Sequence, residues 1–503
     1  MLTSISKTFQ EVVPLRYFKS KLLHQSGFYM VGQILQKAVS LLLVPLWTRY
    51  LTPSDYGIVG ILATYSGMLG VLLLFGIHAA VTRHYFDFKE DHGAQRRYVT
   101  SNFLFMAVVP GIIITALIFF GAPLWTLATT SSVTTNEIPF RPLVVLMLIG
   151  VYGSLLYRLP YSLYQAQRKA WKCVALDFGA FVLSVGISLV LVVGLRKGVY
   201  GMILGGCIAQ ILMALVASGL LLREWFVPKV EWAHVSRSLA FGLPYIPHLL
   251  AGWALAFVDR VMLQKMVSED DVGRYSLAIN LGMVMLMIVT SIKDAYEPYY
   301  YNLLSTDAHP DRKIVRIFSL YVTAIGLLAL FGSLFAGELI MLLTPAGYHE
   351  SAIYVPPVIL GYLFLGFYFN VGMAIFYYKK TKFLPFITGF AAICNITLNY
   401  LLIPRFHAIA AAWNTYVCYA IMFTVYYLVA QRVRRFPYPI AKVIALSALA
   451  LLSVLVARSI PTLTLVGILQ KLGLCAAYLG AAYMLLLRRQ SGNEPSNSVK
   501  SEP

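Results

Sequence analysis

Four basic residues of this chain lie within or at the ends of long apolar segments: Lys37, Arg158, Arg260 and Lys293. A Lys or Arg at the centre of a membrane helix costs roughly 2.5–3.5 kcal/mol on insertion scales, so such residues normally face a cavity. A guanidinium donates two parallel hydrogen bonds to the oxygens of a phosphate or carboxylate, and an ammonium offers a compact charge. These side chains therefore indicate a site for an anionic group inside a membrane.

Lys37 and Arg83 are the candidate anion-binding residues in the first part of the chain. Lys37 lies four residues after Gln33 and three before Ser40, so the three form one polar stripe on a helix. This stripe either lines a cavity or packs against another helix through hydrogen bonds. Arg83 ends the second apolar segment, where an ordinary anchor at the cytoplasmic interface is the alternative to substrate binding. Arg158 is expected to snorkel to the interface.

Asp259 and Arg260 give the strongest local signal, near the outer end of the seventh apolar segment. They form either a structural ion pair or part of a transport route, with Arg260 binding substrate. His248 precedes Asp259 by eleven residues, close to three helical turns, so the two share one face. Pro244 and Pro247 lie nearby, and proline in a membrane helix favours bending. Asp259 and His248 are therefore the predicted site for a coupling proton or sodium ion.

Lys293, Asp294 and Glu297 lie at the inner end of the eighth apolar segment. Lys293 and Glu297 are four residues apart, which brings them together on a helix surface as an ion pair. The alternative is that Lys293 binds the phosphate of a substrate on the cytoplasmic side. Two tyrosine clusters, Tyr299–Tyr301 and Tyr377–Tyr378, are typical of the aromatic belt at a membrane interface, although tyrosine rings also stack against sugars.

The composition is that of a membrane protein. Hydrophobic residues make up 59% of the chain and charged residues 12%, whereas a soluble protein carries about 25% charged residues. A helix needs roughly 20 apolar residues to cross the hydrocarbon core. About fourteen such segments occur, centred near Leu41, Gly67, Ile112, Tyr152, Val185, Ile211, Ala254, Met285, Leu327, Leu365, Ile393, Tyr419, Leu449 and Ala477. The apolar residues do not alternate, which argues against a barrel, so we predict an all-α polytopic membrane protein.

The distribution of basic residues predicts the topology. Most of the 40 Lys and Arg residues fall at the termini and in the even-numbered loops, including the run from Arg432 to Arg435. Because such loops stay on the cytoplasmic side, both termini are predicted to be cytoplasmic. The net charge of +19 is then a topology signal plus attraction to anionic lipids. Scattered short basic loops do not indicate binding to nucleic acid.

Two internal repeats predict a duplicated architecture. Arg49–Gly57 and Lys265–Gly273 each end an apolar run at a cation, turn through polar residues, and open the next run with Asp-x-Gly. Arg196–Gly201 and Arg405–Ala410 match at a similar separation. We therefore predict two parallel six-helix lobes followed by two C-terminal helices. Membrane proteins built from related halves commonly hold their substrate where the halves meet.

These repeats give the predicted domain boundaries. A cytoplasmic interfacial segment covers residues 1–24, and a disordered cytoplasmic tail covers 490–503. The N-terminal lobe covers 25–228, the C-terminal lobe 229–436, and the last two membrane helices 437–489.

Three stretches resemble a known family. Asp259-Arg260-Val-Met-Leu with Val272-Gly-Arg-Tyr-Ser-Leu-Ala278 is similar to its "DR…L…vGxYsxA" signature. The stretch from Lys380-Thr-Lys-Phe-Leu-Pro385 through Asn395, Asn399 and Leu402-Ile-Pro404 resembles its "gKTk…p…N…lNyiLIP" pattern. Tyr50–Gly57 resembles its "yLtpeeyGiyg" corner. The family is the polysaccharide-biosynthesis, O-antigen flippase family of the multidrug/oligosaccharidyl-lipid/polysaccharide exporter superfamily.

The resemblance implies a two-lobed flippase of the bacterial inner membrane with a central cavity. Its members move undecaprenyl-pyrophosphate-linked oligosaccharide repeat units to the periplasmic leaflet by alternating access, and polymerisation into O-antigen, capsule or exopolysaccharide follows. A polysaccharide polymerase and chain-length machinery are then expected partners, and a proton or sodium gradient drives at least some relatives. For this chain the resemblance suggests pyrophosphate or sugar binding at Lys37, Arg83, Arg260 and Lys293.

Two other functions stay open at this stage. A cation-coupled drug exporter of the same superfamily is expected to carry acids in its cavity, yet Asp177 is the only acid in the first six apolar segments. A membrane glycan polymerase or acyltransferase is the alternative from a different class, and the short outer loops argue against it. The sequence has no Walker A motif. We predict no catalytic residue, metal site or cofactor.

Overall fold

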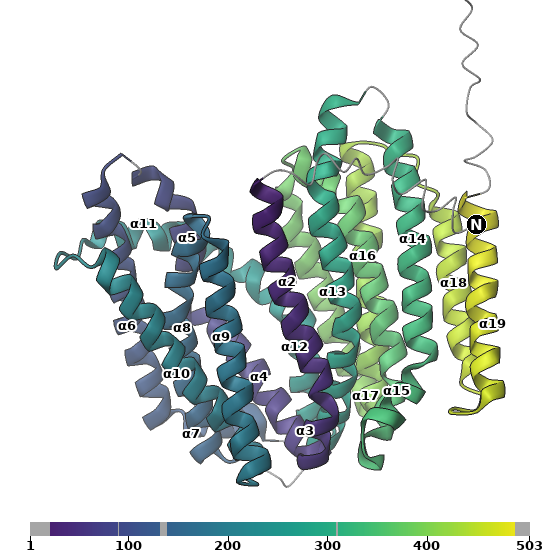
Figure 1. Ribbon diagram of the computed structural model, residues 1–503, viewed down its shortest axis with the longest axis horizontal. Coiled ribbons are helices and arrows are strands. Elements are labelled where there is room, and N and C mark those ends of the chain that lie inside the picture. Colours follow the sequence, from purple (N-terminus) through teal and green to yellow (C-terminus); the bar gives the residue numbers. More distant parts are fainter. Residues whose placement is uncertain (1–20, 89, 131–137, 308–309, 488–503) are drawn as a thin grey trace, which may run out of the picture. The chain divides into compact units, whose positions relative to one another are not determined.

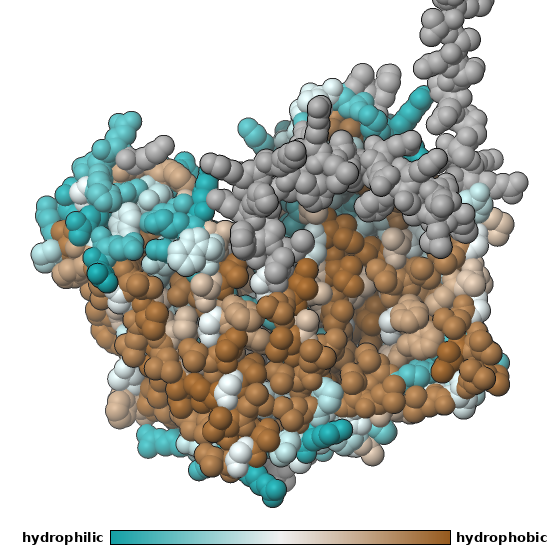
Figure 2. Space-filling model, viewed as in Figure 1, coloured by the Kyte–Doolittle hydropathy of each residue, from teal (hydrophilic) through white to brown (hydrophobic). Residues whose placement is uncertain are grey.

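The computed structural model describes residues 21–88, 90–130, 138–307 and 310–487, and these residues form helices and turns with no strand. Within them, twelve helices are long and apolar enough to cross a membrane, which confirms the predicted all-α multi-pass membrane protein. Figure 2 shows hydrophobic side chains over the middle of the helices and hydrophilic ones near their ends. Most of the predicted interfacial segment 1–24 and the whole tail 490–503 lie outside the described residues.

The predicted count of fourteen spans is approximate. α17 (Leu384–Val433) has 50 residues and consists of two helices that meet at a kink, so it holds two of the predicted spans. Its backbone breaks at His407, where φ is 55°, three residues after Pro404, whose missing N–H weakens the helical ladder. α2 (Lys21–Leu42) corresponds to the first predicted span but is not among the twelve apolar helices.

The chain divides into two compact units. Unit 1 comprises residues 1–51 and 58–253, and unit 2 comprises residues 52–57 and 254–503. Two helices cross this division: α4 (Pro53–Leu73) begins in unit 2 and continues in unit 1, whereas α12 (Ile246–Met266) begins in unit 1 and ends in unit 2.

Unit 1 is built around α8 and α10, which pack against each other and against their neighbours (Figure 1). Its elements are α2, α3 (Val44–Tyr50), most of α4, α5 (Ile77–His84), η2 (Tyr85–Phe88), α6 (His92–Phe120), α7 (Ala122–Thr129), η3 (Phe140–Val144), α8 (Val145–Ala166), α9 (Ala170–Leu189), η4 (Val190–Gly194), α10 (Gly198–Trp225), α11 (Trp232–Gly242), η5 (Leu243–Tyr245) and the first part of α12. The short α11 packs on α5 and α6, and a 2.8 Å hydrogen bond joins the Tyr98 and Ser238 hydroxyls beneath it.

Unit 2 is centred on α16, which packs against α13, α14 and α17. Its elements are the second half of α12, α13 (Glu269–Thr306), α14 (Pro310–Leu334), α15 (Ala336–Leu343), η6 (Ala346–Ile353), α16 (Val355–Tyr377), η7 (Thr381–Phe383), α17, α18 (Ile440–Ala457), α19 (Leu465–Ala482) and η8 (Tyr483–Leu487). The two last helices, α18 and α19, pack against α14 and each other.

The repeated corner of the sequence forms the same cap twice. Ahead of α4, the Thr52 N–H donates to the Asp55 carboxylate at 3.0 Å and the Asp55 N–H donates to the Thr52 hydroxyl at 3.2 Å. Ahead of α13, the Asp271 N–H donates to Ser268 Oγ at 3.1 Å, and the Ser268 hydroxyl donates to Asp271 at 2.6 Å. Both corners thus satisfy backbone donors that a helix start leaves unpaired.

Close backbone packing explains why each corner carries a glycine. A Cβ atom on Gly57 would lie 2.0 Å from the carbonyl oxygen of Glu269, and one on Gly273 would lie 1.9 Å from that of Pro53. All four residues belong to unit 2. The two copies of the corner therefore meet backbone to backbone, which only glycine permits.

Candidate functional site

Asp259 and Arg260 are buried together on α12, in the part that belongs to unit 2. Their exposed fractions are 3% and 5%. Asp259 accepts a hydrogen bond from the Arg260 backbone N–H at 2.8 Å and another from the Tyr275 hydroxyl on α13. The Asp259 carboxyl is therefore held by two donors, neither of which is the Arg260 guanidinium.

The Arg260 guanidinium lies 5.2 Å from the centre of the Phe257 ring. Within the described residues, no carboxylate lies at ion-pair distance from it, and its buried Nε has no hydrogen-bond partner. The alternative of a structural ion pair with Asp259 is thus not what the structure shows. Adjacent residues of a helix do not face each other, and a buried cation without a counter-ion is costly.

A second set of hydrogen-bonded polar side chains lies on α17, next to the Tyr275 hydroxyl that bonds to Asp259. The Tyr275 hydroxyl lies 3.3 Å from that of Thr415, which is preceded by Asn414. The Asn414 side-chain N–H donates to Asn399 at 2.8 Å, and Asn399 donates to Asn395 at 3.1 Å. These bonds connect the two halves of α17 across its break. Asn395 and Asn399 thus bond within α17, and Thr415, the residue after Asn414, contacts the Tyr275 hydroxyl that bonds to Asp259.

Lys293 forms the local ion pairs that its spacing predicts. Its ammonium lies 3.1 Å from Asp294 and 3.3 Å from Glu297. The side chains of Lys293 and Glu297 are about one-third exposed, and that of Asp294 is 67% exposed. Lys293 therefore carries two counter-ions, in contrast to Arg260.

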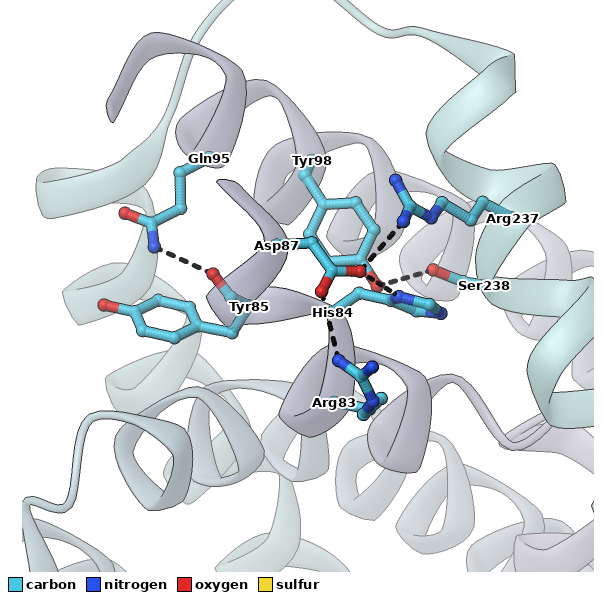
Figure 3. A network of polar contacts seen from close by, with 8 residues as sticks. All are labelled: Arg83, His84, Tyr85, Asp87, Gln95, Tyr98, Arg237 and Ser238. Atoms are coloured by element: carbon cyan, nitrogen blue, oxygen red, sulfur yellow. Dashed lines mark hydrogen bonds and ion pairs between the residues drawn. The ribbon is translucent and has the colours of Figure 1, made fainter. Parts of the chain in front are cut away.

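Arg83 takes part in a polar network around Asp87 in unit 1 (Figure 3). Asp87 accepts from Arg83 at 3.0 Å, from His84 at 2.7 Å and from Arg237 of α11 at 2.8 Å. The hydrogen bond from His84, followed by that from Arg83, holds the pKa of the Asp87 carboxyl below its usual value. Asp87 thus ties α11 to the end of α5. The Arg83 side chain stays 62% exposed.

Lys37 and His248 also belong to unit 1. Lys37 is exposed on α2, and the nearby Ser40 hydroxyl donates to the Gln36 carbonyl at 2.8 Å. His248 is half-buried on α12, its ring 5.6 Å from that of Tyr245. Of the six predicted site residues, Asp259 and Arg260 are the two that the structure brings together.

The sequence interpretation missed several buried polar residues. Tyr275 stands in the family signature, but its bond to Asp259, like the contact of Thr415, is set by helix packing. Glu338 on α15 and Lys471 on α19 form a buried ion pair at 2.6 Å. Their signal was available, since each is a charged residue in a strongly apolar helix.

Comparison with known proteins decides the family. The model described as "Polysaccharide biosynthesis protein" matches residues 22–304, which is more than half of the chain. The chain belongs to this family. A further model, described as "MatE", matches residues 244–401, so the superfamily indicated by the sequence motifs is confirmed.

Relatives of this polysaccharide biosynthesis protein include a Haemophilus influenzae protein named for the Lsg locus. It is 22% identical over 289 residues, which cover 56% of this chain and 67% of the relative. The fold resembles that of the lipid II flippase MurJ in an inward closed conformation, with a TM-score of 0.72, 14% identity, and coverage of 91% of this chain and 99% of MurJ. An inward-facing multidrug resistance MATE transporter of the MOP superfamily matches with a TM-score of 0.61 and 13% identity over 79% of this chain and 94% of that one. At these identities the two structures establish the fold alone.

Proposed function

We propose that the protein is a flippase that moves an undecaprenyl-pyrophosphate-linked oligosaccharide repeat unit across the bacterial inner membrane. The product would feed assembly of O-antigen, capsule or exopolysaccharide by a separate polymerase. Membership of the polysaccharide biosynthesis family supports this proposal, as does the fold that the chain shares with the lipid II flippase MurJ. Both termini are proposed to be cytoplasmic, and transport to occur by alternating access.

The observation that carries the proposal is Arg260. A pyrophosphate is a polyanion that must cross the hydrocarbon region with its sugars, and a buried cation outside any direct ion pair lowers the cost of that passage. Arg260 is buried, lies beyond ion-pair distance of the described carboxylates, and has an unused donor. Its fork of donors suits two phosphate oxygens at once. In unit 1, we propose that Lys37 and the exposed Arg83 contribute further positive charge to the substrate route.

Asp259 is the proposed site of ion coupling. The hydroxyls of Tyr275 and Thr415 and the amide oxygens beyond them are hard oxygen ligands of the kind that cations such as sodium take. A proton binding to the Asp259 carboxyl is the other form of coupling that this network allows. His248, eleven residues before Asp259 on α12, is proposed as a second residue of a proton route.

Arg260 variants test the substrate role. Arg260→Ala should abolish complementation of a deletion strain while the amount of protein in the membrane stays near wild type. Arg260→Lys should recover part of the function, because a point charge does not reproduce the fork of donors. The matched control is Arg223→Ala, which removes an exposed arginine at the end of α10 and should complement fully. Full complementation by Arg260→Ala would remove the charged-route proposal.

Asp259 variants separate coupling from structure. Asp259→Asn keeps the side-chain shape and the acceptor for Tyr275 but removes the titratable carboxyl. If Asp259 carries the coupling ion, Asp259→Asn should fold yet remain inactive. If Asp259 serves only as a hydrogen-bond acceptor for Tyr275, Asp259→Asn should keep much of the activity. Complementation assays with membrane-protein quantification distinguish the two results.

A cation-coupled drug exporter is the second candidate, because the MatE match covers residues 244–401. The two functions differ in the phenotype of a deletion. Loss of a flippase should stop surface polysaccharide while lipid-linked repeat units accumulate. Unchanged polysaccharide combined with new drug sensitivity would instead favour the exporter.

A further inference from the structure

A continuous row of polar and aromatic side chains joins α13 and α16, which pack together in unit 2 (Figure 1). At one end the Lys293 ammonium lies 5.7 Å from the centre of the Phe369 ring. At the other end the rings of Tyr301 and Tyr377 lie 5.7 Å apart. Glu297 connects the two ends, since it pairs with Lys293 at 3.3 Å and accepts from the Tyr301 hydroxyl at 2.7 Å. We name these five residues, together with Asp294, whose carboxylate lies 3.1 Å from the Lys293 ammonium, the α13–α16 strip.

The charge of the strip does not suit a phosphate. Lys293 contributes one positive charge, whereas its two partners, Asp294 and Glu297, contribute two negative charges within 3.3 Å of the ammonium. A pyrophosphate bound there would be repelled by both carboxylates or would have to displace them. Arg260, in contrast, lies beyond ion-pair distance of the described carboxylates. The two sites therefore favour different parts of a substrate.

The groups of the strip suit a sugar ring. A carboxylate accepts hydrogen bonds from hydroxyl groups, and an ammonium donates them. Aromatic rings offer flat apolar faces against which the C–H face of a sugar packs, while the tyrosine hydroxyls supply a polar edge. Lys293 and Glu297 are about one-third exposed, and Tyr301 and Tyr377 are half-buried. A ligand can thus reach these side chains without unfolding of the helices.

We propose that the α13–α16 strip binds a sugar of the lipid-linked oligosaccharide, while Arg260 binds its pyrophosphate. This inference rests on the proposed flippase function and adds a specificity to it. Because the charges of Lys293, Asp294 and Glu297 sum to −1, the strip favours a neutral or amino sugar over a uronic acid. Tyr301 and Tyr377 hold the ring, and Glu297 orients its hydroxyls.

Binding to two probes tests this inference with the full-length protein in lipid nanodiscs. One probe is undecaprenyl pyrophosphate, which has no sugar. The other is the lipid-linked repeat unit extracted from membranes of the deletion strain. Glu297→Gln and Tyr377→Leu should each weaken binding of the glycosylated probe about tenfold or more, as expected for loss of a hydrogen bond to a charged group or of a buried contact. Binding of undecaprenyl pyrophosphate should stay unchanged, which also shows that both variants fold.

Matched controls remove the same side chains elsewhere. Glu224→Gln takes away a carboxylate that pairs with Lys172, and Tyr400→Leu takes away a tyrosine that is 64% exposed on α17. Both controls should bind both probes like wild type. Equal losses for the two probes in the strip variants, or no loss for either probe, would overturn the sugar site and leave the flippase intact. Failure of the wild type to bind either probe would overturn the proposed function and the sugar site with it.

Discussion

The buried pair Glu338–Lys471 allows a quantitative prediction about how α19 is attached to α15 within unit 2. Lys471 Nζ lies 2.6 Å from Glu338 Oε1, and the two side chains are 3% and 9% exposed. At an effective dielectric constant of about 20, two unit charges at this distance attract each other by about 6 kcal/mol. Desolvation opposes that attraction, and the second carboxylate oxygen of Glu338 has no hydrogen-bond partner in the described part of the chain.

Removing one partner should therefore lower the free energy of unfolding by more than the intact pair contributes to it, because the remaining charge stays buried without its partner. Lys471→Met alone leaves the Glu338 carboxylate buried without a counter-charge, and Glu338→Gln alone leaves the Lys471 ammonium in the same state. Each single change should cost about 3–5 kcal/mol. The double variant places two uncharged side chains of similar volume in contact, so its stability should lie close to that of the wild type.

The assay is a double-mutant cycle on protein purified in detergent, read as the thermal midpoint of unfolding and as the rate of tryptic cleavage between α17 and α18. Both single variants should unfold at lower temperature and be cleaved faster, and the double variant should recover most of both losses. If the losses of the single variants add in the double variant, the two charges are not coupled. That result would refute the assignment of this pair as the attachment of α19.

Three further predictions concern topology, the Asp87 network and the paired corners. Reporter fusions at Arg196 and Arg435 should report opposite sides of the membrane, and the same side for both would contradict the fourteen-span topology. The Asp87 carboxyl has a pKa below its ordinary value of 3.8, so its contribution to holding α11 is present at neutral pH and lost only as the pH falls below that value. Hydrogen exchange of the α11 amides, corrected for intrinsic rates, should accelerate in that acidic range, and acceleration already near pH 6 would contradict Asp87 as the controlling group. Gly57→Ala should destabilise the protein by about 1–3 kcal/mol through overpacking, because its Cβ would lie 2.0 Å from the Glu269 carbonyl oxygen. Gly70→Ala on the same helix meets nothing within 4 Å and should be neutral or slightly stabilising in the same thermal assay.

Sequence patterns predict those features of this protein that depend on neighbours in the chain. The apolar segments became helices, and the four-residue spacing of Lys293 and Glu297 gave an ion pair. The Asp-x-Gly corners became capped helix starts. In each case the deciding interaction lies within one or two helical turns, where periodicity and capping rules apply.

The partners of Asp259 and Arg83 could not be predicted in the same way. Asp259 bonds to Tyr275, sixteen residues away on the next helix, and the Arg83 partner Asp87 is shared with Arg237, 150 residues away. Such contacts depend on how helices pack, which no local spacing encodes.

A transport assay in liposomes tests directly whether the protein is a flippase. The purified protein is reconstituted into liposomes with the extracted lipid-linked repeat unit, and a membrane-impermeant oxidant or lectin measures how much of the sugar reaches the opposite leaflet with time. We predict rapid movement with the wild type and movement no faster than in protein-free liposomes with Arg260→Gln. Equal rates for the wild type and protein-free liposomes under an imposed proton or sodium gradient would contradict the flippase assignment, and equal rates for the wild type and Arg260→Gln would contradict the role of Arg260.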